Sequence, residues 1–475
     1  MQVISDVKVI KINFFIIYNV FMFNHLLCFR CKYSFFYSIL QIFFSLSDTL
    51  GVIKTLRSEK EISFVSPKYI RGVFMPLNGV IIDRGAVTTR ICKNNGRSLA
   101  HVRIVSYFCR VIDVLMINQN EDRRLASLDV FRGITVAGMI LVNNEPGDTF
   151  TPLAHSEWNG MTPCDLVFPF FLYIMGISTF LSLRKTGFQP SLGAARKIAK
   201  RTILIFLIGL AINWLANAVG GDWSLGHLRI MAVLQRIAIC YCAVALMAIF
   251  VNHRYFLHIS FALLAAYTVI LLLGNGYATD ESNIALRIDK AILGDSHLYR
   301  HSPIDPEGLL GTIAAIAHAL IGFWCGRAIV QAQDASAKVT NALIPGACLV
   351  LGGYLLSYAL PPNKSIWSPS FVLLTTGLAS LLLGILIHVI DTRNHSRWTR
   401  PFLVFGVNPL FLYTFSEVMA IVGWQTGLYE MLWDGLIRTF VTNSRWASLC
   451  FALTIVAICG AAGSWLYKHK LFIKI

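Results

Sequence analysis

The sequence predicts an all-α polytopic membrane protein with about ten transmembrane helices, and three observations lead to that fold class. Of the 475 residues, 56% are hydrophobic and only 14% are charged, whereas soluble domains contain about 25% charged residues. The mean hydropathy is +0.62. Apolar stretches of about 20 residues recur from Leu125 onward, and each can cross a hydrocarbon core of roughly 30 Å as a helix. These values exclude a cytosolic enzyme, a disordered chain and a secreted disulfide scaffold.

The ten predicted spans follow one another at regular intervals, and helices are required because lipid cannot satisfy an open backbone. They cover residues 128–143, 164–183, 201–219, 229–251, 254–274, 309–330, 341–360, 369–390, 401–424 and 446–467. The stretch 426–440 is too polar to cross and is predicted to lie at the membrane interface.

Loop charge predicts the orientation of these spans, because Lys and Arg are enriched in cytoplasmic loops. The loop after the second span contains six basic residues and no acidic one, between Arg184 and Arg201. The loop at 144–163 contains acidic residues and no Lys or Arg. The alternation places both termini in the cytoplasm and residues 144–163 outside. The formal net charge of +16 is therefore attributed to loops on one membrane side, and no nucleic-acid partner is expected.

Residues 1–115 differ from the rest in composition. They contain 15 Lys and Arg against 6 Asp and Glu, which is +9 of the total of +16. Three interpretations are open: a further anchor within residues 12–46, a targeting segment, and a start codon assigned too early. We favour the last, with the start at Met116, and treat 116–475 as the transmembrane domain. The lone pair Cys28 and Cys31 is a weak zinc signal, and no metal is expected.

Polar side chains in or beside spans are costly in lipid, which makes them functional candidates. A first cluster opens the first span, where Asp129 and Arg132 share one helix face, and it ends at Asn143 and Asn144. The pair either neutralises itself or allows Arg132 to hold an anionic cofactor.

A second cluster is the outward loop from His155 through Glu157 and Trp158 to Asp165. A histidine titrates near neutral pH, so it can take a proton from an amine or carry an acyl group. Asp165 or Glu157 is expected to orient the imidazole. The alternative is an ordinary surface histidine.

A third cluster surrounds Arg236, which is predicted about two turns inside the fourth span. A charge at that depth needs a carboxylate, a phosphate or water. The structural alternative to a phosphate is an ion pair with Asp165 or Glu417.

A fourth cluster joins Asp305 and Glu307 to the segment containing Asn363, Lys364 and Trp367. A charge beside a flat ring suits a sugar or a nucleotide. Trp367 is alternatively an interface anchor. The chain has no GxGxxG, P-loop or HExxH motif, so neither nucleotide hydrolysis nor zinc catalysis is indicated.

Together the clusters resemble the heparan-α-glucosaminide N-acetyltransferase family and its bacterial relatives. The matching strings run in the family's order over roughly residues 123–424: LDVFRGITVAGMILVNN, HSEWNGMTPCDLVFPFFLYIMG, LRIMAVLQRIA, DPEGLLGTI and PPNKSIWSPSFVL. The resemblance implies a multi-pass membrane enzyme that moves an acetyl group from acetyl-CoA to a terminal glucosamine amine, with His155 as the catalytic histidine. Residues 1–115 have no counterpart in the family, so we expect a bacterial relative in the inner membrane.

The resemblance and the residues together suggest roles for the remaining candidates. His155 either acts as general base or carries the acetyl group itself. Asn143 or Asn144 is a candidate donor to the tetrahedral oxyanion. Arg132, Arg236 and Lys364 are candidate contacts for CoA phosphates. Expected partners are acetyl-CoA, a glucosamine-containing sugar, the bilayer and further copies of the chain. The alternative function is an amino-sugar permease, which needs no acyl donor.

Overall fold

The computed structural model describes residues 125–299 and 302–473, all within one structural unit that extends from Val114 to Ile475. This described part contains helices and no strand. The extension 1–115, the anchor within 12–46, the Cys28–Cys31 pair and the start at Met116 all lie outside the described residues.

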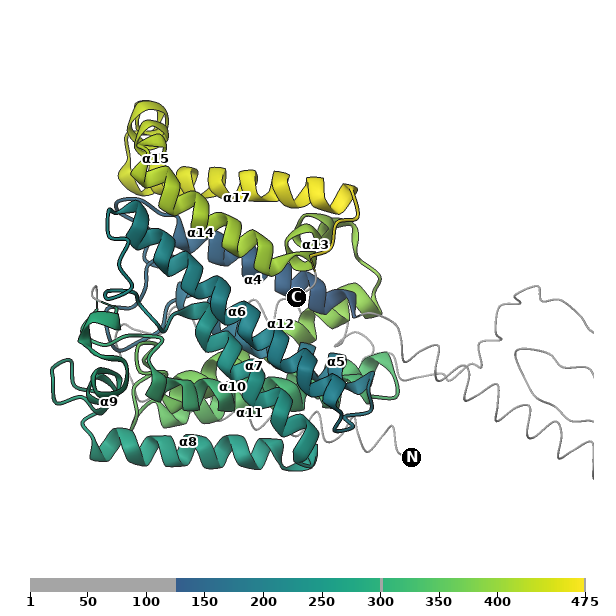
Figure 1. Ribbon diagram of the computed structural model, residues 1–475. Coiled ribbons are helices and arrows are strands. Elements are labelled where there is room, and N and C mark those ends of the chain that lie inside the picture. Colours follow the sequence, from purple (N-terminus) through teal and green to yellow (C-terminus); the bar gives the residue numbers. More distant parts are fainter. Residues whose placement is uncertain (1–124, 300–301, 474–475) are drawn as a thin grey trace, which may run out of the picture. The chain divides into compact units, whose positions relative to one another are not determined.

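Long helices make up most of the described chain (Figure 1). They are α4 (Ala126–Asn143), α5 (Val167–Arg184), α6 (Leu192–Val219), α7 (Val233–Phe250), α8 (Phe256–Leu273), α10 (Leu309–Val330), α11 (Ala335–Leu356), α12 (Pro369–Leu386), α14 (Pro409–Gln425) and α17 (Ser444–Lys468). Shorter elements are η2 (Cys164–Leu166), η3 (His253–Tyr255), α9 (Ile284–Leu293), η4 (Asp295–His297), the π-helical η5 (Ile387–Thr392), η6 (Arg397–Thr399), α13 (Arg400–Val407), α15 (Leu428–Glu430), the π-helical η7 (Met431–Ile437) and α16 (Arg438–Phe440).

The prediction of an all-helical multi-pass membrane protein is confirmed. Within the described residues, nine helices are long and apolar enough to cross a membrane, and one bent pair of helices is a tenth candidate. Each of these corresponds in order to one of the ten predicted spans. The fourth begins later than predicted, at Val233 rather than at residue 229. Arg236 therefore lies in the first turn of α7, and its predicted depth of two turns is wrong.

The ninth predicted span is not one straight helix. Residues 397–407 and Pro409–Gln425 meet at an angle of 73°. Asn408 between them has φ −122° and ψ 53°, outside the helical region. The cause is Pro409, because a proline ring disfavours the helical conformation of the residue before it.

Glycines allow the central helices to approach closely. A side-chain carbon on Gly176 of α5 would meet the backbone of Ala319 in α10, and one on Gly322 would meet the carbonyl of Tyr173. Gly133 of α4 and Gly406 of α13 form a similar contact. Such small residues favour association of helices in lipid.

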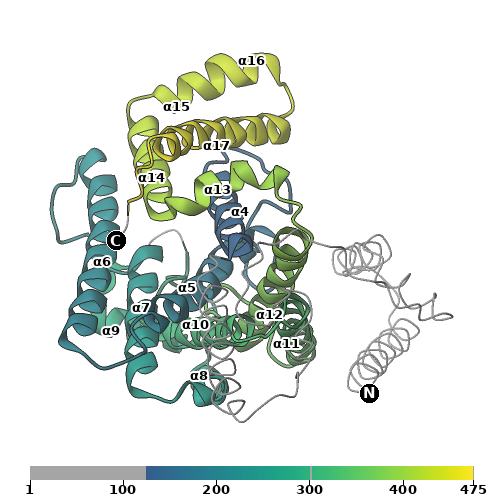
Figure 2. The ribbon, with the colours of Figure 1, turned by 90° about the vertical axis from the view of Figure 1, so that its right-hand side faces the viewer.

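The helices differ strongly in how far they are enclosed. Within the apolar part of each helix, 78% of α10 and 83% of the span containing α12 are buried, against 17% of α6. Figure 2 shows α6 at one edge and α10 towards the centre. Buried polar residues such as His318 on α10 and Thr375 on α12 lie in the enclosed helices, and most of the apolar part of α6 is on the surface of the protein.

The connecting loops gather at two opposite ends of the helices. Residues 144–163, α9 and α15 lie at one end in Figure 1, and the turn between α5 and α6 lies at the other. Which of the two ends faces the cytoplasm stays a prediction from loop charge. The arrangement brings loops that are far apart in sequence into contact at one end, where the candidate site is found.

Candidate functional site

Two loops from distant parts of the sequence meet to form the site. The backbone N–H of Gly160 donates to the carbonyl of Pro362 at 2.7 Å. The amide of Asn363 donates to Asn159 Oδ1 at 3.3 Å. Gly160 has φ +124°, a conformation that suits glycine alone. These contacts position Lys364, on the second loop, beside His155 on the first.

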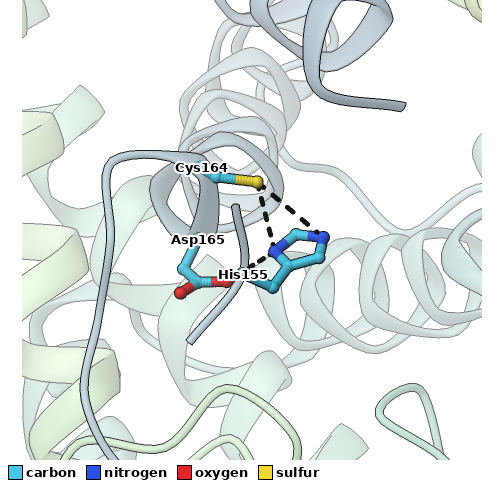
Figure 3. Close-up of side chains that lie close together, drawn as sticks. All are labelled: His155, Cys164 and Asp165. Atoms are coloured by element: carbon cyan, nitrogen blue, oxygen red, sulfur yellow. Dashed lines mark hydrogen bonds and ion pairs between the residues drawn. The ribbon is translucent and has the colours of Figure 1, made fainter. Parts of the chain in front are cut away.

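His155 is held by a buried carboxylate. Its Nδ1 lies 2.7 Å from Oδ1 of Asp165, the second residue of η2 (Figure 3). The histidine side chain is 53% exposed and that of Asp165 is 0% exposed. An ionised carboxylate only accepts hydrogen bonds, so Nδ1 carries the proton and Nε2 keeps its lone pair. Of the two predicted orienting groups, Asp165 is the one that contacts the imidazole, and Glu157 is exposed.

The other oxygen of Asp165 is fully engaged by the loop itself. Oδ2 accepts from the backbone N–H of Ser156, the backbone N–H of Thr162 and the Thr162 hydroxyl, each at 3.1 Å. Three donors on one oxygen stabilise the ionised form and fix the plane of the carboxylate. The loop therefore wraps around the Asp165 side chain, and the carboxylate sets the orientation of the histidine ring.

Lys364 places a positive charge on this pair. Its Nζ is 3.1 Å from Nδ1 and 3.4 Å from Nε2 of His155, and 3.5 Å from Asp165 Oδ1. Only Nε2 has a lone pair that an ammonium can donate to. Lys364 therefore lies against the imidazole of His155 and the carboxylate of Asp165.

Cys164 was not among the predicted site residues. Its Sγ is 3.2 Å from Nδ1 and 3.8 Å from Nε2 of His155. The signal in the sequence was its position next to Asp165, since both open the same helix. Within the described residues, His155, Cys164 and Asp165 form one group able to hold a metal ion.

The end of α4 supplies further polar groups. Asn143 donates to Glu417 Oε1 at 3.0 Å, and the buried Asn144 donates to the carbonyl of Ile140 at 2.8 Å. Glu145 follows them and interacts electrostatically with Cys164, which places it close to the His155 loop. Burial raises the pKa of Glu145 to about 7. The sequence interpretation missed this carboxyl group.

Trp158 fixes the other side of the loop. Its indole N–H donates to the carbonyl of Tyr277 at 3.1 Å. This bond ties the His155 loop to the segment between α8 and α9. Trp158 therefore has a structural contact as well as a half-exposed ring.

Asp305 and Glu307 are paired with a residue that was not predicted. Arg229 Nη2 lies 2.7 Å from a carboxylate oxygen of each. Asp305 also accepts from the backbone N–H groups of Tyr299 and Glu307. Both acids are buried, so this cluster joins residues 302–308 to the segment that precedes α7.

Arg236 and Trp367 lie inside the protein, and neither side chain has exposed surface. Arg236 donates to the carbonyl of Gly308 at 2.8 Å, and its guanidinium lies 5.1 Å from the centre of the Trp367 ring. The expected partners Asp165 and Glu417 are replaced by this carbonyl and ring. The expectation that Trp367 presents an open ring to a sugar or to the membrane interface is wrong, because packing encloses it.

Asp129 and Arg132 form the predicted pair, with Arg132 Nη1 3.0 Å from Asp129 Oδ1. Arg132 also donates to the hydroxyl of Ser178 at 2.8 Å. Arg132 and Asn143 are eleven positions apart on the helix, which corresponds to about 16 Å. The pair therefore belongs to the opposite end of α4 from His155. Asn363 is buried, and its side chain accepts from the backbone N–H of Ile366 at 3.1 Å, so it shapes the Lys364 loop.

Comparison with known proteins identifies what this chain is similar to. A family model described as the catalytic part of heparan-alpha-glucosaminide N-acetyltransferase matches residues 124–286, which include His155, Asp165 and Cys164. Residues 124–286 are therefore similar to the heparan-α-glucosaminide N-acetyltransferase family. The resemblance seen in the sequence motifs is thereby confirmed.

Two curated relatives carry that enzyme's name. The chain is 29% identical over 422 residues to the heparan-alpha-glucosaminide N-acetyltransferase of Mus musculus and 30% identical over 420 residues to that of Homo sapiens. The matches cover 75% and 74% of this chain and 61% and 60% of the relatives. The chain thus spans less than two thirds of the relatives' own length.

Proposed function

We propose that this membrane protein transfers an acetyl group from acetyl-CoA to the amine of a glucosamine-type sugar. The observation that carries the proposal is the exposed His155 ring held at 2.7 Å by the fully buried Asp165, inside the region that matches the acetyltransferase family. A permease needs no such oriented base, and both curated relatives are named as N-acetyltransferases. We therefore favour the enzyme over the transporter.

The reaction requires a neutral amine to attack the thioester carbonyl. The nitrogen forms a bond to the carbonyl carbon while Nε2 of His155 takes a proton from the amine. The carbon–sulfur bond then breaks, and CoA leaves with that proton as a free thiol. Asp165 stabilises the imidazolium in between, and a general base of this kind contributes roughly 10²–10⁴ in rate.

Negative charge develops on the carbonyl oxygen during this attack. The ammonium of Lys364, 3.4 Å from Nε2, is the nearest positive charge to the nitrogen that takes the proton. We assign it to stabilise the oxyanion, because a fixed charge in a partly enclosed site stabilises a transition state more than it does in water. Asn143 and Asn144 remain candidate donors at the end of α4. Glu157 and Trp158 border the acceptor side.

His155 can also accept the acetyl group before the sugar does. Both routes use Nε2, so the same residues serve each. Stopped-flow mixing with acetyl-CoA alone separates them: a burst of CoA without sugar indicates an acetyl-imidazole intermediate, and CoA release that waits for sugar indicates direct transfer.

The experiment that tests the function uses the purified full chain with radiolabelled acetyl-CoA and glucosamine. We expect N-acetylglucosamine and one CoA per acetyl group transferred. Uptake of glucosamine into vesicles without any acetyl-CoA supports the permease instead and contradicts the proposal. A bacterial inner membrane as location and assembly into a homo-oligomer are part of the same proposal.

A further inference from the structure

We infer that His155, Cys164 and Asp165 bind one thiophilic divalent cation, such as Zn²⁺, and that the bound ion blocks the acetyl transfer proposed above. The three side chains offer nitrogen, sulfur and oxygen, the ligand types that zinc takes in proteins. Neither the family resemblance nor the proposed mechanism requires Cys164. The metal site therefore uses a residue that catalysis leaves idle.

The ligand atoms are already grouped (Figure 3). Nδ1 of His155 lies 2.7 Å from Asp165 Oδ1 and 3.2 Å from Cys164 Sγ, and all candidate atoms lie within 4.8 Å of one another. Zinc bonds of about 2.0–2.3 Å at tetrahedral angles place ligand atoms roughly 3.3–3.8 Å apart. Small side-chain rotations convert the present spacing to that one.

The surroundings favour a site with three protein ligands and one open position. Asp165 Oδ2 holds three donors from the loop, so Oδ1 is the oxygen left for the metal, and its direction is fixed by those bonds. Cys164 is 3% exposed and Asp165 is buried, so both ligands lie on the protein side of the site. The half-exposed ring of His155 lies on the solvent side, from which an ion approaches the site.

The position of Lys364 shows that the cluster attracts positive charge. Its ammonium lies within 3.5 Å of His155 and Asp165. A metal ion and this ammonium compete for the same region, because two cations at such separations repel each other strongly. Lys364 is 19% exposed and has a flexible stem, which allows it to move away when an ion enters.

The chemistry explains inhibition. Zinc displaces the thiol proton of Cys164 to solvent and binds the thiolate. For the ion to bond to Nδ1 of His155, the ring proton must leave Nδ1, and the ring takes a proton from solvent on Nε2 instead. The nitrogen proposed to accept a proton from the amine is then blocked, and the bound ion fills the position of the Lys364 charge.

Binding is tested without reference to activity, by titrating the purified full chain with Co²⁺. A thiolate ligand gives cobalt a charge-transfer absorption in the near ultraviolet, so we expect a saturable band in the parent protein. Cys164→Ala removes it, whereas Cys348→Ala, a change at an exposed cysteine, keeps it. Ten of the eleven cysteines are common to the parent and Cys164→Ala, so their difference spectrum isolates Cys164. An unchanged band in Cys164→Ala overturns the site.

Competition is tested with Lys364→Met, which keeps the stem and removes the charge. We expect the Co²⁺ concentration that half-saturates the absorption band to fall by about tenfold or more, because the repulsion is removed. An equal or higher half-saturating concentration in this variant contradicts the inference that the ammonium and the metal ion compete for the same position.

Inhibition is tested by acetyl transfer in buffered Zn²⁺. The parent should lose activity as zinc is added and regain it with a chelator. Cys164→Ala should keep its basal rate, and the Zn²⁺ concentration that halves this rate should be about tenfold higher or more than for the parent. Equal inhibition of the two proteins overturns the regulatory role. If neither protein transfers acetyl groups at any zinc concentration, the proposed function fails, while the cobalt spectrum still decides the metal site.

Discussion

His155 has a close counterpart in the same chain that shows what burial adds. His227 also contacts a carboxylate, with Nδ1 2.9 Å from Asp222 Oδ2, but the carboxylate side chain is 43% exposed. Asp165 is 0% exposed and accepts three further hydrogen bonds. Only the first pair lies next to a lysine and a second loop. The difference between the two is tertiary context, because both are loop histidines whose acid lies within ten positions in sequence.

His155→Ala is expected to lower acetyl-glucosamine formation by roughly 10²–10⁴, the usual effect of a general base. Folding should be nearly intact, because the side chain is half-exposed and its removal leaves no enclosed cavity. His227→Ala is the matched control and should retain the parental rate. The measurement is product formed per minute at equal protein. If His155→Ala keeps more than roughly a tenth of the parental rate, His155 is not the base or acyl carrier.

Asp165→Asn keeps the shape of the side chain but replaces a carboxylate with an amide. The lost negative charge stabilises the imidazolium and selects the tautomer of the neutral ring. We therefore expect the kcat to fall by about 10–100-fold with little change in KM. A thermal melt in detergent separates this effect from misfolding. A normal kcat in a folded variant contradicts a positioning role for Asp165.

Glu145→Gln tests a carboxyl group whose burial raises its pKa to about 7. In the unfolded chain the group ionises near 4.5, so between these values the folded state holds a proton that the unfolded state has lost. Stability contributed by this group therefore falls as pH rises from 4.5 to about 7. We expect Glu145→Gln to flatten the dependence of Tm on pH in this window. Parallel curves for the two proteins would falsify the assignment.

At the scale of elements, contacts between glycine and backbone determine how closely α5 and α10 pack. A methyl group on Gly322 meets the backbone of Tyr173, whereas one on Gly352 in α11 meets nothing within 4 Å. Both glycines lie inside helices, where alanine is intrinsically better by about 1 kcal/mol. The two positions therefore separate helix propensity from interhelical packing.

Gly322→Ala is expected to lower the Tm in detergent, because the α5 and α10 backbones must separate to admit the methyl group. Gly352→Ala should leave the Tm unchanged or raise it slightly. The comparison uses thermal melts of both variants in one detergent. A Tm for Gly322→Ala equal to that of Gly352→Ala shows that close approach at this interface adds nothing to stability.

For the whole molecule, the alternation of loop charge predicts sidedness. Glu157 and Ser191 lie on either side of one span, Cys164–Arg184. Both residues are exposed. A cysteine at Glu157 should react with an impermeant maleimide added outside intact cells, and one at Ser191 only after the membrane is opened. Reaction of both from one side contradicts the predicted topology.

The number and order of the spans were predictable because each helix needs about 20 apolar residues to cross the lipid, and this requirement shows in the local sequence. Residue patterns predicted the order of the nine spanning helices and the bent pair, and they predicted the pairing of Asp129 with Arg132. The bend at Asn408 was not predicted because the stretch is apolar throughout, and its hydropathy does not show the helix break before Pro409.

Other features needed the tertiary structure. Lys364 lies 209 positions from His155, and no local pattern joins them. Only the docking of the two loops, through Gly160 and Pro362, brings the lysine to the histidine. Likewise, a tryptophan beside a lysine predicts an exposed ring as readily as a buried one, and packing around Arg236 decided that Trp367 is enclosed. The sequence by itself determined which segments cross the membrane and which histidine to examine. The chain's packing decided that Asp165, Cys164 and Lys364 surround that histidine, because contacts between distant segments depend on how whole helices fit together.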